Sequence, residues 1–215
     1  MVSDPFRRLA DTFGVAPLPY ALFYAFPHAL RFELGGEIFC SDTEAVFRFL
    51  QAFDRARAVN RELFTTSQSV SALISYVAGA RSAGQARKVR QQVKALGIGH
   101  DLGQPSRIAS DEEGFELDGG TFRYCHCIDL PPRSYVIDAL LWGAVSREMA
   151  IEPRLRGARL YLVDFDRGIL LHAYDDRGMD VIATSPDPLL PLYETFADWL
   201  LDYDRPAMDA TFSRR

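Results

Sequence analysis

The chain has 215 residues, of which 48% are hydrophobic and 25% are charged, and its formal net charge is −5. These proportions are those of a globular protein, and 15 Phe and 9 Tyr can fill a sizeable core, so disorder throughout the chain is excluded. No apolar run approaches the roughly 18 residues of a membrane helix, so a membrane-spanning protein is not expected.

The first part of the chain is predicted to alternate helices with strands. A helix over 4–13 begins at an Asp-Pro pair. The segment ALRFEL (29–34) alternates apolar with charged residues, as a half-buried strand does. The sequence SDTE (41–44) matches a capping box, in which Ser41 and Glu44 satisfy each other's backbone N–H groups. We expect an amphipathic helix directly after it.

The middle of the chain is predicted to contain two more strands, two helices and a long connection. SVSALISYV (69–77) has strand character on both faces, and a basic helix is expected over about 82–96. The stretch 97–120 contains six glycines, so we predict a long flexible loop there. A strand at 121–130 and a helix at 134–149 follow.

Three short strands and a helix are predicted at the carboxy-terminal end. The strands lie at about 159–165, 168–174 and 179–184, and the helix at 188–203. An Asp-Arg-Gly sequence separates each pair of strands, and such a turn, closed by a left-handed glycine, joins antiparallel strands. We therefore predict a single α+β domain over 1–215. Its mainly antiparallel sheet ends in a three-stranded meander, with the long carboxy-terminal helix packed on it.

Both ends of the chain resemble a bacterial family. ARLYLVDFDRGILLHAYDDRGMDVIA (158–183) and LPLYETFADWLLDYDR (190–205) resemble the end of the family called domain of unknown function 3885. LFYAFPHALRFELG (22–35) and LQAFDRARAVNRELF (50–64) are similar to its opening strand and first long helix. The resemblance implies a small bacterial cytoplasmic protein, and it transfers no catalytic residue to this chain.

The segment HAYDDRGMDVIA, which starts at His172, holds more charge than a turn requires. Turn chemistry explains one aspartate and the glycine, but it does not explain Asp175, Asp180 or the histidine. Histidine with aspartate suits general acid–base work, so His172 and Asp176 are weak catalytic candidates. Alternatively the segment is a docking surface anchored by Arg177, because arginine is enriched at interface hot spots.

The predicted final helix carries a row of like charges. Glu194, Asp198 and Asp202 recur every four residues, and each such pair destabilises a helix by about 0.2–0.5 kcal/mol. Asp202 also lies in the last turn, where the helix dipole disfavours an anion. We expect the row to be offset by the basic residues around 81–94 or by a basic partner protein. A solvated acidic face that the fold tolerates is the remaining interpretation.

These features predict a non-catalytic protein-binding module, which as an immunity protein would neutralise a basic toxin. The sequence contains no Walker loop, dinucleotide fingerprint, nucleophile elbow or zinc-protease motif. No metal or cofactor is expected, and Cys125 and Cys127 are expected to be buried strand cysteines. The residues predicted to contact the partner are Asp175, Asp176, Arg177, Asp180, Glu194, Asp198 and Asp202.

Two alternatives belong to other classes of function. One is a metal-assisted hydrolase that uses His172 and the aspartates at 164–180, which we expect to gather near one end of the meander. The other is a structural or regulatory domain with no small-molecule site. Nucleic-acid binding is not expected, because the net charge is negative and no aromatic residue is interleaved with the positive charges of the basic helix.

Overall fold

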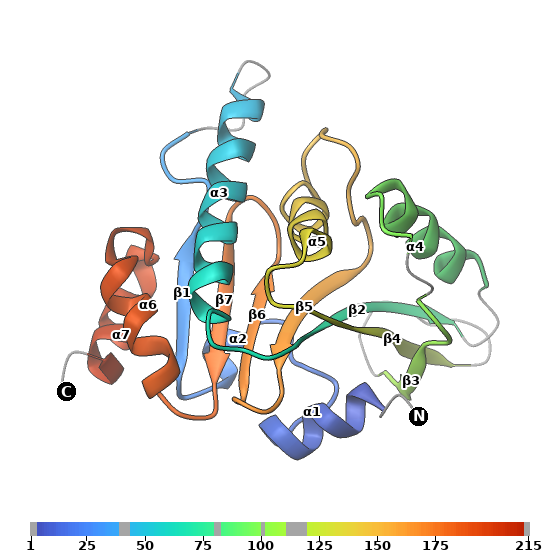
Figure 1. Ribbon diagram of the computed structural model, residues 1–215, viewed down its shortest axis with the longest axis horizontal. Helices are drawn as coiled ribbons and strands as arrows, with labels where there is room; N and C mark the ends of the chain where they lie inside the picture. The colour runs from blue at the N-terminus through green and yellow to red at the C-terminus, as the bar shows by residue number, and fades with distance from the viewer. Residues whose placement is uncertain (1–3, 39–43, 80–82, 100–101, 111–119, 213–215) are drawn as a thin grey trace.

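A seven-stranded antiparallel sheet organises the part of the chain that the computed structural model describes, which is residues 4–38, 44–79, 83–99, 102–110 and 120–212 (Figure 1). The strand order is β1-β7-β6-β5-β2-β4-β3, so the first strand of the sequence pairs with the last. The strands are β1 (Ala29–Glu33), β2 (Val70–Gly79), β3 (Ser106–Ala109), β4 (Thr121–Leu130), β5 (Arg159–Asp164), β6 (Ile169–Ala173) and β7 (Gly178–Ala183). The predicted α+β class, with an antiparallel sheet that ends in a meander, is confirmed.

Helices pack on both faces of this sheet. Helices α3 and α5 lie across one face, α4 packs beside β2, and α1 and α2 contact the other face (Figure 1). The helices are α1 (Pro5–Phe13), α2 (Leu22–Ala25), α3 (Ala45–Leu63), α4 (Ala83–Ala95), α5 (Tyr135–Val145), α6 (Leu190–Thr195) and α7 (Arg205–Phe212). Three 3₁₀ turns complete the set: η1 (Asp187–Leu189), η2 (Ala197–Trp199) and η3 (Asp202–Asp204). None of the helices in the described ranges is long and apolar enough to cross a membrane.

The two faces of the sheet differ in chemistry. On the face under α3 and α5, paired residues of neighbouring strands such as Leu162 and Leu171 are fully buried. Trp142 of α5 packs on Phe49 of α3 with their ring centroids 4.4 Å apart, so the two helices form one apolar layer. Burial of such apolar surface contributes about 25 cal/mol per Å² and supplies the main stabilisation of the domain. The opposite face carries charged and polar side chains on the same strands, and it holds the candidate site.

The predicted carboxy-terminal helix at 188–203 is only partly confirmed. The segment forms η1, α6 and η2, and the chain becomes extended at Leu200. Leu200 is buried and forms a β-bridge with Phe32 of β1, and the backbone N–H of Leu201 donates to the carbonyl of Arg31 at 2.9 Å. These contacts cover the edge of β1, whose backbone groups would otherwise lack partners. The α-helix itself ends at Thr195, and pairing of Leu200 with the sheet stops the helical run short of the predicted end at 203.

The two Asp-Arg-Gly sequences form the turns of the meander as predicted, but their glycines serve different purposes. Asp164 accepts hydrogen bonds from two following backbone N–H groups at 3.0 Å, and Gly168 has a φ of 61°. Gly178 does not adopt a positive φ. A Cβ atom there would lie 2.7 Å from the backbone carbonyl oxygen of Phe32 on β1, so this position requires glycine for close packing.

Two sequence expectations concern stretches that the structure describes only in part. Strand β3 lies within 97–120 and pairs with β4, so a segment of the predicted loop belongs to the sheet, while 100–101 and 111–119 lie outside the described residues. Ser41 of the predicted capping box also lies outside them. Helix α3 begins at Ala45 with Glu44 at its N-cap, so Glu44 does not occupy the third helical position that the capping box assigns to it.

Candidate ligand-binding site

A row of polar side chains crosses the face of the sheet that α1 and α2 contact. The register pairs Arg31 of β1 with Asp180 of β7, and Asp180 with His172 of β6. Tyr161 of β5 continues the row, with its ring centroid 4.4 Å from that of His172. Because directly paired residues of neighbouring strands point to the same face, four residues that are distant in sequence form one polar strip.

Asp180 is the centre of a buried ion-pair network. The residue is 1% exposed, and its carboxylate accepts hydrogen bonds from Nε and Nη2 of Arg31 at 2.8 and 3.0 Å and from the backbone N–H of Phe23 at 3.0 Å. Asp204 accepts from Nη1 of Arg31 at 3.3 Å and from the Tyr24 hydroxyl at 3.0 Å. Burial disfavours the charge of Arg31, but the hydrogen bonds and charge of Asp180 outweigh it and hold the pKa of the guanidinium above its ordinary value. The network ties β1, β7, α2 and the carboxy-terminal segment together.

His172 lies on the same strip and is uncharged at neutral pH. The residue is 3% exposed, and its Nδ1 lies 2.7 Å from the carbonyl oxygen of Leu160, so Nδ1 carries the proton and donates it. Burial lowers the pKa of His172 to about 4. The bond to Leu160 and the charge of Asp180 oppose this shift, whereas the charges of Arg159 and Arg147 add to it.

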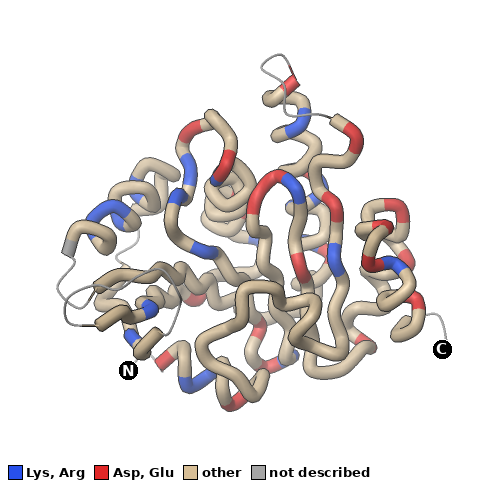
Figure 2. Tube along the Cα trace, turned by 180° about the vertical axis from the view of Figure 1, so that it is seen from behind, with Lys and Arg blue, Asp and Glu red and all other residues tan. Residues whose placement is uncertain are grey.

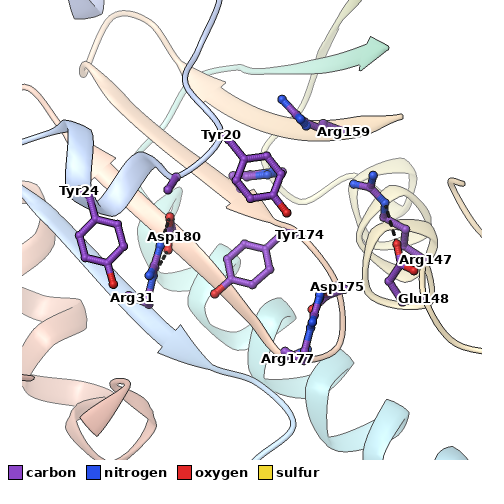
Figure 3. Close-up of a pocket in the computed structure, with 12 residues that line it drawn as sticks. Tyr20, Tyr24, Arg31, Arg147, Glu148, Arg159, Tyr174, Asp175, Arg177 and Asp180 are labelled. Carbon is purple, nitrogen blue, oxygen red and sulfur yellow. Dashed lines mark hydrogen bonds and ion pairs between the residues drawn. The ribbon is translucent and has the colours of Figure 1, made fainter. Parts of the chain in front are cut away.

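A cavity of about 360 Å³ opens on the polar strip (Figure 3). In Figure 3, Tyr24 and Arg31 lie at one side of it, and Arg147 and Glu148, from the segment after α5, lie at the other. The cavity is lined by Tyr20, Ala21, Tyr24, Arg31, Arg147, Glu148, Arg159, His172, Tyr174, Asp175, Arg177 and Asp180. Its volume falls within the range of about 300–1,000 Å³ that small-molecule sites occupy.

The cavity lining carries more arginine than carboxylate. In the part of the chain that the structure describes, the lining contains four arginines and three carboxylates. Each carboxylate forms an ion pair with one arginine: Asp180 with Arg31, Asp175 with Arg177, and Glu148 with Arg147. The fourth arginine, Arg159, places its guanidinium carbon 4.9 Å from the ring centroid of Tyr20, within the range of a cation–π interaction. The cavity therefore has a net positive charge and favours an anionic group.

A second cavity, of about 290 Å³, adjoins the first. Arg147 and Arg159 line both, so these two side chains stand at the junction. The second cavity also includes Arg123 and Ser75; Arg123 is 3% exposed, and its Nη1 donates to the Ser75 hydroxyl oxygen at 3.3 Å. None of the lining residues that belong to the described ranges is acidic. Positive charge is therefore concentrated where the two cavities meet.

The aspartates predicted to contact a partner are buried, and they pair within the protein. Asp175 accepts from the backbone N–H of Arg177 at 2.8 Å and from its Nε at 2.9 Å. Asp176 bonds to Nε of Arg48, which lies 128 residues away in α3. Asp180 belongs to the network described above, whereas the side chain of Arg177 is 70% exposed. The three carboxylates therefore stabilise the fold and do not form an open acidic surface.

The aspartates of the meander do not gather at one end of it, contrary to the sequence expectation. Asp164 lies at the turn between β5 and β6, whereas Asp175 and Asp176 lie at the opposite end of β6. Asp180 lies beside His172 on the polar face. Within the described ranges, no group of three His, Cys, Asp or Glu side chains is placed to hold a metal ion. The metal-assisted hydrolase stays a prediction that this arrangement of carboxylates does not favour.

The remaining predicted contact residues lie apart from the cavity. Glu194, Asp198 and Asp202 are exposed, and none of them forms an ion pair with another residue of the described part of the chain. The basic helix α4 lies on the other side of the molecule from α6 and α7, so it does not offset these charges (Figure 2). The break in the helix at Leu200 instead separates Asp202 from the other two acids, which relieves the i,i+4 repulsion.

Sequence reasoning missed the residues that define the cavity. Four of them belong to no recognisable motif. Tyr20 and Arg147 lie in connections, Tyr24 lies in the short helix α2, and Arg159 is the first residue of β5. Arg31 was expected to point outward from a half-buried strand, yet its side chain is only 12% exposed. The alternation that placed Arg31 on the polar face was a valid signal. Its meaning depended on the pairing of β1 with β7, which local sequence does not specify.

Two comparisons with known proteins give matches. The family described as Domain of unknown function (DUF3885) matches residues 6–204. The uncharacterized protein YnaE of Bacillus subtilis (strain 168) is 31% identical to this chain over 77 residues, which make up 34% of this chain and 36% of that protein. The match therefore spans about a third of the length of that relative. No solved structure matches the chain.

Proposed function

We propose that this chain, which belongs to the DUF3885 family, is a non-catalytic binding module whose ligand places an anionic group against Arg147 and Arg159 in the cavity on the polar face of the sheet. The observation that carries the proposal is the excess of arginines over carboxylates in a cavity large enough for a small molecule. Arginine suits this role because its planar guanidinium group offers several fixed donors to a carboxylate or phosphate.

The surroundings of these arginines support the proposal. Arg147 has a single modest ion pair, at 3.4 Å, to its neighbour Glu148, whose side chain is 56% exposed. Such a pair is weak in contact with water, so an anionic ligand can compete for Arg147. His172 brings no charge to the cavity floor at neutral pH, and the buried Arg31–Asp180 pair holds the neighbouring wall in place. The site is therefore largely formed before a ligand binds.

Replacing Arg147 is expected to weaken anion binding. Inorganic phosphate should bind the native protein in a titration monitored by calorimetry, and Arg147→Gln should raise its dissociation constant about tenfold or more, because a hydrogen bond to a charged group contributes about 1.5–3 kcal/mol. Glu148→Gln should act in the opposite direction and tighten binding, since it removes the carboxylate that competes for Arg147.

Arg87→Gln is the matched control for this experiment. Arg87 is exposed on α4 and does not line either cavity, so its loss removes the same charge from a distant surface. Equal weakening by the Arg87 and Arg147 substitutions would show that phosphate responds only to net charge and would contradict the proposal. Absence of phosphate binding to the native protein would contradict it as well.

A second candidate function is the docking of a basic protein partner, as an immunity protein docks a toxin. The exposure of Glu194, Asp198 and Asp202 favours it, because acidic surfaces speed association with basic partners. Tyr203, which is 84% exposed, adds an aromatic side chain beside these acids, and tyrosine is enriched at interface hot spots. Both candidates assume a cytoplasmic protein, in agreement with the free thiol of Cys125.

Charge reversal tests this second candidate. In the double variant Asp198→Lys and Asp202→Lys, the association rate with a basic partner recovered from the native host should fall by about tenfold or more at low salt, and the difference should shrink as salt is raised. Reversal of Asp11, which is exposed on α1, serves as the control for net charge. An unchanged association rate in the double variant would rule out docking through these acids.

A further inference from the structure

We propose that the ligand of this cavity is a nucleoside polyphosphate, with its phosphates at the junction formed by Arg147 and Arg159 and its base against the tyrosines at the rim. This inference rests on the proposed function, because it names the class of anion that the site takes. Two independent observations carry it: the second cavity that shares the two arginines, and the exposed aromatic rings beside them.

The second cavity extends the positive region beyond the space that a single small anion fills. Arg147 and Arg159 are common to both cavities, and Arg123 adds a third arginine on the far side. Among the described residues that line this second cavity none is acidic, whereas the first has a carboxylate beside each of three arginines. A chain of phosphates, with a charge on each unit, matches a row of arginines better than one compact anion does.

The aromatic rings supply the other half of the recognition. Tyr20 is 76% exposed and Tyr24 is 63% exposed, although both line the first cavity. Exposed rings at the mouth of a cavity offer apolar faces on which a planar ligand group can stack. Arg159 lies 4.9 Å from the Tyr20 ring centroid, so a phosphate on Arg159 brings the attached nucleoside next to that ring. Every nucleobase has a π-face that can stack on tyrosine, so such stacking depends little on which base is present.

The hydrogen-bonding groups between the rings and the arginines suit a sugar. Tyr174 lines the first cavity and lies between Tyr20 and Arg177 in Figure 3, with its hydroxyl directed toward the side of Arg31. Burial and the charge of Asp180 raise the pKa of the Tyr174 hydroxyl, which therefore remains a hydrogen-bond donor throughout the physiological range. A ribose placed between base and phosphate meets a donor of this kind.

The experiment compares three probes on the native protein by calorimetric titration. ATP carries base, sugar and phosphates; tripolyphosphate carries the phosphates alone; adenosine carries the base and sugar alone. ATP is expected to bind about tenfold or more tightly than tripolyphosphate, because stacking of one base on an aromatic side chain is worth a factor of that order. Adenosine is expected to bind much more weakly than either. GTP in place of ATP tests whether the base is discriminated.

Two variants and one control assign the contacts. Tyr20→Ala should reduce ATP affinity to the level of tripolyphosphate without changing tripolyphosphate binding, and the exposure of Tyr20 means that folding is preserved. Arg147→Gln should weaken both phosphate probes by about tenfold or more. Arg87→Gln, on the basic helix α4, should change neither.

The outcomes separate this inference from the proposed function. If tripolyphosphate binds as tightly as ATP and Arg147→Gln weakens it, the anion site stands and the nucleotide class is overturned. If Arg87→Gln weakens binding as much as Arg147→Gln, both are overturned, because the phosphates then bind the basic helix. If none of the three probes binds, both are overturned as well.

Discussion

Replacing Asp180 with alanine is expected to lower the free energy of unfolding by about 3–5 kcal/mol, because it leaves the positive charge of Arg31 in a buried site without its main partner. The carboxylate makes two hydrogen bonds to Arg31 and one to the backbone N–H of Phe23, and the residue is 1% exposed. Asp204, at 3.3 Å from Arg31, offsets only part of the loss. Urea unfolding followed by circular dichroism measures the change.

The matched control is an ion pair of the same residue types in contact with water. Arg7 and Asp11 lie 3.7 Å apart on α1, with their side chains 81% and 71% exposed, so Asp11→Ala should cost less than about 0.5 kcal/mol. Asp180→Asn, which keeps the size and one acceptor oxygen, should lie between the two alanine variants. Similar small losses at Asp180 and Asp11 would show that the network contributes specificity to the fold and little stability.

Local sequence patterns predicted most of the elements and failed where long-range pairing decides the structure. The strand predicted at 121–130 is β4, and the helix predicted at 4–13 is α1 with one residue fewer. These segments succeed because alternation and helix-start signals act over a few residues. The α-helix within the predicted segment 188–203 ends at Thr195, and the helical run stops after Trp199 because Leu200 pairs with β1.

The charge pattern of the carboxy-terminal region predicted an acidic contact surface where the structure has buried ion pairs. The sequence shows an excess of acids there, and it does not show that Asp176 pairs with Arg48 or that Asp180 pairs with Arg31, at separations of 128 and 149 residues. Compensation across a sheet depends on strand order, and strand order is not encoded in net charge. The buried aspartates were therefore interpreted as a surface, while the arginines that line the cavity were not recognised.

The decrease in the free energy of unfolding at acidic pH is expected to depend on His172. Burial lowers its pKa from 6.5 to about 4 in the folded protein. Between these two values the unfolded chain binds a proton that the folded chain does not, so stability decreases as the pH falls through this window and the loss is complete below the folded value. For shifts of this size, His172 should account for a loss of roughly 2 kcal/mol between pH 7.5 and pH 5.

His172→Gln removes this titration while keeping a side-chain N–H that can donate to the carbonyl of Leu160. We expect the variant to be less stable than the native protein at neutral pH, because it loses the ring contact with Tyr161, whose centroid lies 4.4 Å away. As the pH is lowered, the gap should close, because the native protein alone incurs the cost of keeping a buried imidazole unprotonated. The other titrating groups are common to both proteins, so the difference between their urea-unfolding free energies isolates His172. Parallel pH profiles for the two proteins would show that folded and unfolded chains take up the His172 proton over the same pH range. The polar face beside Arg147 and Arg159 would then tolerate a further positive charge.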